Sequence, residues 1–458
     1  MPKEDVILKD ICKREIDNKL YDIEANDISI YNVVRRSCRD IMMSLYGYGE
    51  NIRVQNASAN ECRKTFIKSF WQLIKIVITG KKAENLIRSF ERIEKVDGLY
   101  IDKFTDPLID YSAIGDSYII FEKARTGKHL TPRIHETDVF FTDCIYRFAH
   151  HLLPILKKLY LKKYNSQVCC LLSTINSTFP EIEINKERTI NTIIENDFCV
   201  QFFVFLFRKL GVKKLFAPAR GSFMHMIPAA KKLGIKVYEL QHGVTYSESL
   251  TYSGYNDPMF TPDFFLSFGK INNAWCYGIT ENKIIEIGWA FEKYLDTEQS
   301  DNNLQNKVLI ISSPAISKQM VSITCFLASK NQHIHFFFRP HPNEQIGSEG
   351  LKKLKGYPNI TIDNNLENIL VTLMRFTNVV GENSTVLYEA LSMGKKVGKL
   401  HMEGLEPKYL CEEDISLFYE IKNSDDFVEF IKAPQDDKPS KKLYTVFKPD
   451  VVNKLLNN

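Results

Sequence analysis

The sequence lacks the short motifs that identify many nucleotide and metal enzymes. It contains no G-x-x-x-x-G-K-[ST] or G-x-G-x-x-G phosphate loop, no H-E-x-x-H zinc helix and no G-x-S-x-G nucleophile turn. It also has no convincing D-x-D pair that would hold a divalent metal on a sugar diphosphate. We therefore expect neither metal nor cofactor, and we expect side chains and main-chain N–H groups to meet any phosphate charge.

Strong net charge and long apolar runs are absent too. The 458 residues carry a net charge of only +4, so no general nucleic-acid-binding surface is expected. The ten cysteines form no C-x-x-C pair, which favours reduced thiols in the cytoplasm. The first residues have no apolar signal-peptide core, and no apolar run approaches the ~20 residues that span a bilayer. These features predict a cytoplasmic protein, either soluble or attached to a membrane surface.

One segment departs from the even charge balance. Residues 34–92 contain 12 Lys or Arg against 5 Asp or Glu. A helix within it would place these apolar side chains on one face: Phe66, Phe70, Leu73, Ile74 and Val77. The Lys and Arg side chains of this helix lie largely on its other faces. The helix therefore either packs on its own domain or lies on an anionic membrane surface.

Alternating strand and helix patterns predict two doubly wound α/β domains facing each other across a cleft. A continuous apolar run at 307–314 suits a buried parallel strand, and further strands are expected at 333–342, 378–384 and 395–400 with helices between them. A similar alternation runs from 213 to 269. The polar stretch DTEQSDNNLQN supplies the boundary. We expect an N-terminal domain at 1–295, a linker at 296–306, a C-terminal domain at 307–435 and a helical tail at 436–458.

The strand at 333–342 ends in an unusual Arg-Pro-His-Pro sequence. Proline cannot continue a sheet ladder, so Pro340 and Pro342 end the strand and restrict His341. Arg339 offers a planar fork suited to phosphate, and His341 offers a ring donor. An ordinary tight turn is the alternative. We predict phosphate contacts from Arg339, His341 and Pro342 together with Ser313 and Lys318 after the preceding strand.

The stretch VVGENSTVLYEAL predicts a second part of the same anion site. The strand ends at Gly381, and Asn383 or Ser384 is a candidate N-cap for a helix from Thr385. Free N–H groups and the dipole at a helix start favour a bound anion. Glu389 follows one turn later, within reach of the ribose of such a nucleotide. Ordinary capping with a solvated Glu389 is the alternative.

A general base is the remaining requirement. The strand YELQHG ends on His242, whose neutral imidazole suits proton removal from an acceptor hydroxyl. A structural role in fixing the loop is the alternative for His242. The stretch at 100–117 places Asp102, Asp106, Asp110 and Asp116 near strand ends and offers Asp106 and Asp110 as rival carboxylate bases. Solvated loop carboxylates are the alternative for them.

These motifs resemble those of bacterial surface-polysaccharide transferases with the GT-B fold. RPHP, followed some forty residues later by GENSTVLYEAL and GKKV, is similar to their His-Pro and Ser-Ser/Thr motifs. The group includes polysialyltransferases, capsule Kdo transferases and CDP-glycerol glycerophosphotransferases. ELQHGV, PDFFLSFG and IIEIGWAFEKYL resemble the N-terminal half of capsule and lipopolysaccharide glycosyltransferases. The likeness covers residues 213–400.

The resemblance implies roles for several residues. In that group the two motifs bind the nucleotide monophosphate, which here assigns His341, Pro342, Ser384 and Thr385. The acidic motif of polysialyltransferases has only one acid here, at Asp97, so the base stays open. The implied activity is inverting, metal-independent transfer from a nucleotide-sugar, with a CMP-sugar favoured. The acceptor would be a glycan or lipid-linked glycan of capsule or lipopolysaccharide synthesis, at the inner membrane surface.

Three other functions share these features. A CDP-alditol polyol-phosphate transferase would use the same phosphate site. A sugar-nucleotide 2-epimerase has the same paired domains and needs no acceptor. A glycan-binding or assembly subunit would have no activity at all.

Overall fold

The computed structural model describes residues 4–47, 57–90, 93–115, 117–124, 127–246, 249–270, 278–294, 306–342, 344–365, 367–410, 412–435 and 444–457. Apart from residue 306, the expected linker lies outside these ranges, as do Asp116 and the first part of the expected tail.

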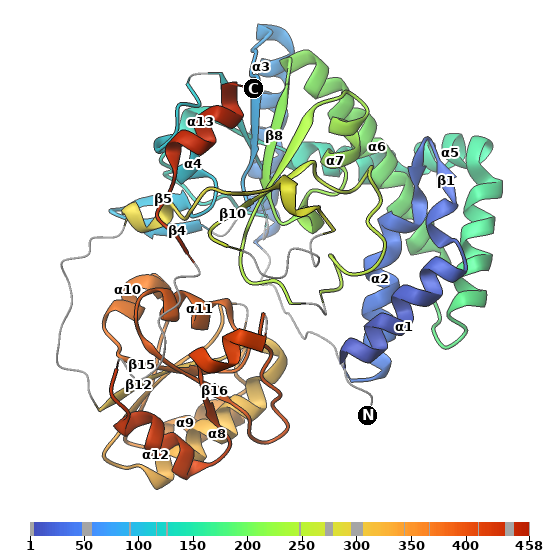
Figure 1. The fold of residues 1–458 in the computed structure, drawn as a ribbon. Helices are drawn as coiled ribbons and strands as arrows, with labels where there is room; N and C mark the ends of the chain where they lie inside the picture. The colour runs from blue at the N-terminus through green and yellow to red at the C-terminus, as the bar shows by residue number, and fades with distance from the viewer. Residues whose placement is uncertain are drawn as a thin grey trace.

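The N-terminal domain is built on a seven-stranded parallel sheet (Figure 1). Its strands are β3 (Asn85–Arg88), β6 (Tyr118–Glu122), β7 (Val139–Phe141), β8 (Lys214–Pro218), β9 (Lys236–Leu240), β10 (Phe264–Ser267) and β11 (Ile284–Glu286). In space they run β11-β10-β9-β8-β3-β6-β7, and every pairing is parallel. The chain order therefore reverses between β3 and β8.

Helices cover both faces of this sheet. One face packs against α3 (Ala59–Thr79), α5 (Asp143–Thr178), α6 (Lys186–Leu210) and α7 (Met226–Lys231). The other packs against α4 (Asp106–Asp110) and the C-terminal helix α13 (Pro449–Asn457), which returns from the far end of the chain. The Asn453 side chain accepts a 2.6 Å hydrogen bond from the N–H of Ala113, so α13 is bound to this domain.

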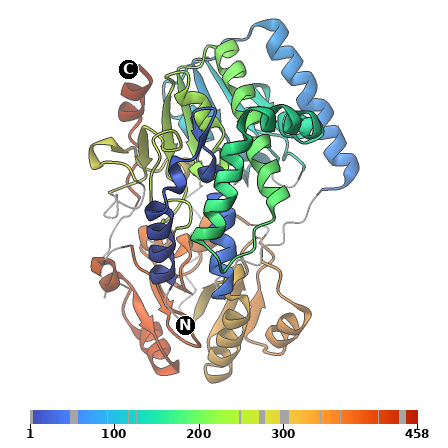
Figure 2. The same ribbon diagram turned by 90° about the vertical axis from the view of Figure 1, so that its right-hand side faces the viewer.

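Two additions extend the N-terminal domain. The helices α1 (Glu4–Asp17) and α2 (Ile30–Leu45), with the hairpin of β1 (Glu24–Ala25) and β2 (Ile28–Ser29), form a separate apolar cluster with α5 and α6. A second hairpin, β4 (Ile93–Val96) and β5 (Leu99–Asp102), lies outside the main sheet. Figure 2 shows α1 and α2 extending from the N-terminal domain toward the C-terminal domain.

The C-terminal domain has a six-stranded parallel sheet in the order β14-β13-β12-β15-β16-β17. The strands are β12 (Lys307–Ile311), β13 (His335–Arg339), β14 (Ile360–Ile362), β15 (Asn378–Gly381), β16 (Lys396–Leu400) and β17 (Tyr419–Ile421). One face packs against α8 (Ser317–Lys330), α9 (Ser348–Lys355) and α12 (Ser424–Lys432), and the other against α10 (Ile369–Met374) and α11 (Thr385–Ser392). Here the chain order reverses between β12 and β15.

An apolar cluster joins the two domains. Ile101, Phe104 and Phe268 of the N-terminal domain pack with Leu387 and Tyr388 of α11. In Figure 1, α10 and α11 lie on the side of the C-terminal domain that faces the N-terminal domain. The two parallel, doubly wound sheets confirm the expected fold class, α/β with a GT-B-like pair of Rossmann-like domains.

One helix passes a simple test for a membrane span. Among the described residues, α6 alone is long and apolar enough to cross a bilayer by length and composition. However, its Phe203 and Phe207 are fully buried in the core of the N-terminal domain, which accounts for its apolar sequence.

Candidate functional site

The topology marks one edge of each sheet as a binding position. In doubly wound sheets, ligands bind beyond the carboxyl ends of the strands, where the strand order reverses. In the C-terminal domain this point lies between Ser313, which follows β12, and Gly381, which ends β15. A Cβ on Gly381 would lie 3.0 Å from the carbonyl oxygen of Ile311, so only glycine fits without a shift.

The start of α11 lies at this point and faces the N-terminal domain. Ser384 is the N-cap, and its hydroxyl accepts a 3.2 Å hydrogen bond from the N–H of Val386. Thr385 Oγ1 accepts a 3.3 Å hydrogen bond from the N–H of Val244 in the other domain. A Cβ on Gly243 would lie 3.0 Å from the same Oγ1. The two domains therefore make close contact at the start of α11.

His341 lies at the same edge, after β13. Its N–H donates a 2.9 Å hydrogen bond to Glu344, whose other oxygen accepts 2.8 Å from the Ser312 hydroxyl. The turn is thereby tied to the end of β12, with His341 half-buried and Pro342 exposed. Since β13 and β15 flank β12, about 10 Å separates the two strands. The segments around 341 and 384 thus share one edge of one sheet.

Arg339 requires a correction. Its guanidinium is buried and donates to Asp363 Oδ2 at 2.7 Å, to Thr372 Oγ1 at 2.8 Å and to the carbonyl of Glu367 at 2.5 Å. The guanidinium of Arg339 is thus held by groups of the C-terminal domain. The structure therefore assigns Arg339 a structural role and not the expected phosphate contact.

Glu389 also has a different partner from the one expected. Its carboxylate is buried and lies 3.5 Å from Lys103 Nζ of the N-terminal domain, in place of the expected ribose contact. The side chain of Asn383 holds a neighbouring loop, accepting 2.6 Å from the N–H of Lys408. Lys318 is exposed in the first turn of α8. The helix start and His341 are therefore the central parts of the expected anion site.

A pocket of about 600 Å³ lies at the corresponding edge of the N-terminal sheet. Phe90 follows β3, and Ala219 to Met224 follow β8, so the pocket lies where that sheet reverses its strand order. It is also lined by Asn32, Arg35, Arg36, His242, Val244, Thr245, Tyr246, Ser249, Leu250, Thr251, Tyr252 and Lys408. Sequence reasoning found only His242 among these, although a polar and aromatic loop after it was a visible signal.

His242 lies within this lining and beside the interdomain contact. Its ring centroid is 5.3 Å from that of Phe90 and 6.5 Å from that of Tyr252. Because Gly243 and Val244 follow it directly and meet Thr385, the imidazole is held close to the start of α11.

The two aspartates proposed as bases do not line the pocket. Asp106 is fully buried and accepts from Arg133 at 3.0 and 3.1 Å. Burial raises its pKa to about 6, against the lowering effect of Arg133. Asp110 accepts from the Tyr294 hydroxyl and lies 2.9 Å from His135 Nε2. Both belong to the short helix α4.

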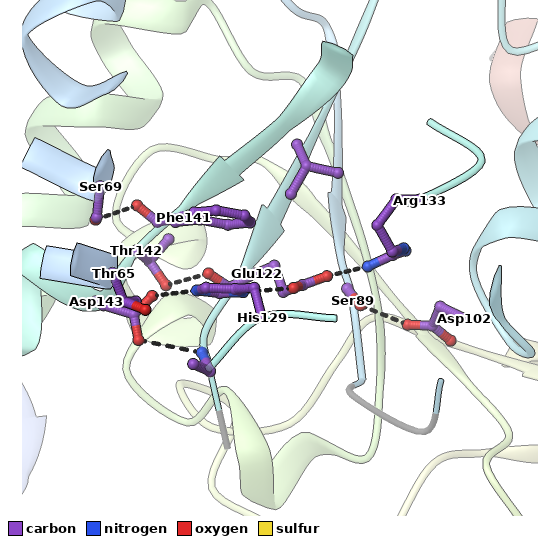
Figure 3. A network of polar contacts seen from close by, with 12 residues as sticks. Thr65, Ser69, Ser89, Asp102, Glu122, His129, Arg133, Phe141, Thr142 and Asp143 are labelled. Atoms are coloured by element: carbon purple, nitrogen blue, oxygen red, sulfur yellow. Dashed lines mark hydrogen bonds and ion pairs between the residues drawn. The ribbon is translucent and has the colours of Figure 1, made fainter. Parts of the chain in front are cut away.

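Through Arg133, Asp106 joins a buried polar network. Figure 3 shows the part of this network around Glu122, His129 and Asp143. His129 lies 2.5 Å from Glu122 and 2.7 Å from Asp143, and Glu122 also pairs with Arg133. Burial lowers the pKa of His129, but the two carboxylates outweigh this and raise it. Among the described residues, no group of three or more His, Cys, Asp or Glu is arranged to hold a metal ion.

The network reaches the pocket through Asp102. Its Oδ2 accepts 2.7 Å from the Ser89 hydroxyl and 2.6 Å from the N–H of Phe90. Asp102 thereby fixes the turn after β3, from which Phe90 contacts the ring of His242. The network therefore positions the pocket wall.

No protein-family model and no curated protein sequence matches the chain. Solved structures do resemble it. The UDP-GlcNAc 2-epimerase from Methanocaldococcus jannaschii is 12% identical with a TM-score of 0.49, over 81% of this chain and 98% of its own. MnaA from S. aureus, solved with UDP, is 10% identical with a TM-score of 0.47, over 82% and 95%. A mutant of S. aureus TarM, in complex with Fondaparinux, alpha-GlcNAc-glycerol and UDP, is 14% identical with a TM-score of 0.34, over 58% and 52%. At these identities the likeness concerns the fold alone.

Proposed function

We propose that this chain is an inverting glycosyltransferase that uses a nucleotide-sugar donor. One observation carries the proposal: Thr385, at the helix start on the switch point of the C-terminal sheet, contacts Val244, two residues from His242 in the pocket of the N-terminal sheet. A donor site and an acceptor site at these two positions would bring their reacting groups together.

The residues have the following roles in this proposal. The positive end of the α11 helix dipole and the imidazole of His341 bind the donor phosphate and stabilise the charge that develops as the nucleotide leaves. His242 removes the proton from the acceptor hydroxyl. The oxygen then attacks the anomeric carbon from the N-terminal side while the bond to phosphate breaks, so the configuration inverts. In this proposal protein groups alone meet the phosphate charge, with neither metal nor cofactor.

The resemblance of the RPHP and GENST motifs supports a narrower substrate class. We propose a CMP-sugar as donor and a glycan or lipid-linked glycan of a bacterial capsule or lipopolysaccharide as acceptor. Screening CMP, CDP, UDP and GDP by thermal shift tests the nucleotide, since a ligand that binds the native state raises the melting temperature.

The assignment of His242 is tested by replacing it with Gln. We expect kcat to fall by about 10²–10⁴-fold with the nucleotide Kd unchanged. His151→Gln, an exposed histidine on α5, is the matched control and should behave like wild type. A His242→Gln variant with normal kcat would remove the base from the proposal.

Two alternative reactions use the same donor site. Polyol-phosphate transfer from a CDP-alditol would form a phosphodiester, which phosphorus NMR of the product detects. A 2-epimerase would convert the donor without an acceptor. The pocket of about 600 Å³ at the N-terminal switch point offers space for an acceptor, which favours a two-substrate reaction over epimerisation.

We also propose a location at the cytoplasmic surface of the inner membrane. The apolar face expected on α3 packs instead inside the domain, through Phe66, Phe70, Leu73 and Val77. A second apolar stripe of α3 is exposed to solvent. It consists of Ile67, Trp71 and Ile78, whose exposed fractions are 45%, 62% and 78%. The exposed cations of the same face are Lys64, Lys68 and Lys75. In Figure 2, α3 lies along the outer edge of the N-terminal domain.

A further inference from the structure

Three cationic side chains line the pocket of the N-terminal domain. Arg35 and Arg36 come from α2, and Lys408 comes from the C-terminal domain. No Asp or Glu is among the described residues that line it. The rest of the lining is aromatic, aliphatic or hydroxyl-bearing, apart from Asn32 and His242. The side chains that line the pocket therefore carry a net positive charge.

The charge of Arg35 is the least compensated of the three. Arg36 donates to Asp40 at 2.8 Å, and Lys408 Nζ pairs with Glu4. Arg35 donates instead to two main-chain carbonyls, at 3.1 Å to Tyr255 and at 2.9 Å to Thr251. In the described part of the chain it forms no ion pair.

Asp257, a carboxylate whose pKa Arg35 affects, already has hydrogen-bond partners. Asp257 accepts 2.8 Å from Asn32 Nδ2 and 2.7 Å from the N–H of Met259. Burial raises its pKa, whereas Arg35 lowers it. Asp257 thus does not take the place of an ion-pair partner for Arg35.

Other cations lie at the same edge of the sheet. His225 follows the pocket residue Met224 and is half-buried, with its Nε2 2.5 Å from the Tyr146 hydroxyl. Its pKa is lowered to about 3, first by burial and then by Lys123 and Arg88. Arg88 ends β3 and Lys123 follows β6, so both cations lie at the carboxyl ends of strands beside the pocket.

We propose that this pocket binds an anionic acceptor, a sugar that carries a carboxylate or phosphate group, with the anion on Arg35. The inference rests on the proposed transferase function and names its acceptor class. Phe90 and Tyr246 add aromatic surface for the sugar, and His242 lines the same pocket. A volume of about 600 Å³ suits one or two sugar rings.

Calorimetric titration with paired probes tests this. Trigalacturonate is compared with neutral maltotriose, and glucose 6-phosphate with glucose. The first pair measures the preference for a carboxylate, and the second measures the preference for a phosphate. We expect at least one anionic probe to bind about tenfold or more tightly than its neutral partner, the contribution of one charge-assisted hydrogen bond. Raising NaCl from about 50 to about 500 mM should abolish this preference without any mutation. Equal binding of charged and neutral probes in both pairs would overturn the proposal.

Variants assign the preference to the pocket. Arg35→Gln should lose about tenfold in affinity for the preferred anionic probe, and Arg35→Lys should retain part of it. Arg208→Gln, an exposed arginine at the end of α6, is the matched control and should bind as wild type does. If Arg35→Gln binds the probe normally while Ser384→Ala loses it, the anion binds at the donor site and the proposal fails.

Nucleotide binding, measured on the same proteins, separates the two proposals. If nucleotides bind but no anion preference exists, only the acceptor class is wrong. If the anion preference exists but no nucleotide binds, the transferase function is wrong and the pocket remains an anionic-sugar site.

Discussion

Lys103 Nζ lies 3.5 Å from Glu389 Oε1, and both side chains are buried between the two domains. Lys103 follows β5 in the N-terminal domain, and Glu389 is on α11. The ion pair therefore ties the N-terminal domain to the helix whose start is the proposed donor site. It acts together with the apolar cluster around Phe104 and Leu387.

Breaking this pair should destabilise the protein. Removal of one partner leaves a buried charge unpaired, so Lys103→Met and Glu389→Gln should each lower the free energy of unfolding by about 3–5 kcal/mol. The double variant should lose less unfolding free energy than the two single variants lose together. Urea unfolding measures this. If Glu389→Gln instead keeps full stability and loses nucleotide binding, Glu389 contacts the ribose, as its sequence position first suggested.

Arg339 should behave as a structural residue. Arg339→Lys keeps the charge but loses the fork that reaches Asp363, Thr372 and Glu367, so we expect a loss of about 1–3 kcal/mol in the free energy of unfolding. Nucleotide affinity of the folded variant should stay within about twofold of wild type. Lys353→Met removes an exposed cation and should change stability by at most about 0.5 kcal/mol. A stable Arg339→Lys variant that no longer binds nucleotide would restore the phosphate role.

Lys399 should make stability depend on pH. It is fully buried in the C-terminal domain, where its Nζ donates to the carbonyl of Lys408. The groups that face it are the rings of Tyr246, Tyr388, Tyr409 and Phe418 and the carboxyls of Glu382 and Asp414. Burial lowers its pKa to about 7, and the two carboxyls oppose this only in part.

The sign of this effect follows from proton binding. Between pH 7 and 10.5 the unfolded chain keeps a proton on Lys399 that the folded protein has lost, so stability rises with pH in this window. Relative to Lys399→Met, wild type should gain up to about 1.4 kcal/mol per pH unit. Urea unfolding at pH 7, 8 and 9 provides the comparison. If the free energy of unfolding changes with pH equally in wild type and in Lys399→Met, Lys399 stays charged in the folded state.

The exposed stripe of α3 should bind anionic lipid. Wild type should float with vesicles that contain phosphatidylglycerol and not with purely neutral ones, and added salt should weaken the binding. Trp71→Glu should abolish flotation at unchanged melting temperature, because this side chain is 62% exposed. Leu159→Glu changes an apolar side chain of equal exposure on α5 and is the control. Equal loss in both variants would contradict a specific role for α3.

Much of the C-terminal domain was predictable because its central strands are buried on both faces. The runs that became β12, β13 and β15 have apolar centres, and each is followed by a helix. By contrast β3, at the centre of the N-terminal sheet, is only four residues long and has Asn85 and Arg88 at its ends, so its pattern gives little signal. The carboxyl end of this missed strand is where Phe90 enters the pocket.

The sequence could point to a candidate site but not to the partners of its residues. Strand ends and helix starts are local features, which is why Ser384 and His341 could be proposed from the sequence. The partners of charged residues are not local: Arg339 meets Asp363, and Glu389 meets a lysine 286 positions away. Arg35 and Lys408 join one pocket only because the topology brings α2 and the C-terminal domain to the same switch point.

Calorimetric titration of the preferred nucleotide, for wild type and for His341→Ala, tests the central proposal most directly. The proposal is that the edge of the C-terminal sheet shared by His341 and Ser384 binds the donor phosphate. It predicts that His341→Ala weakens nucleotide binding about tenfold or more, while His333→Ala, an exposed histidine before the same strand, binds as wild type does. Equal affinity in His341→Ala and wild type would contradict it.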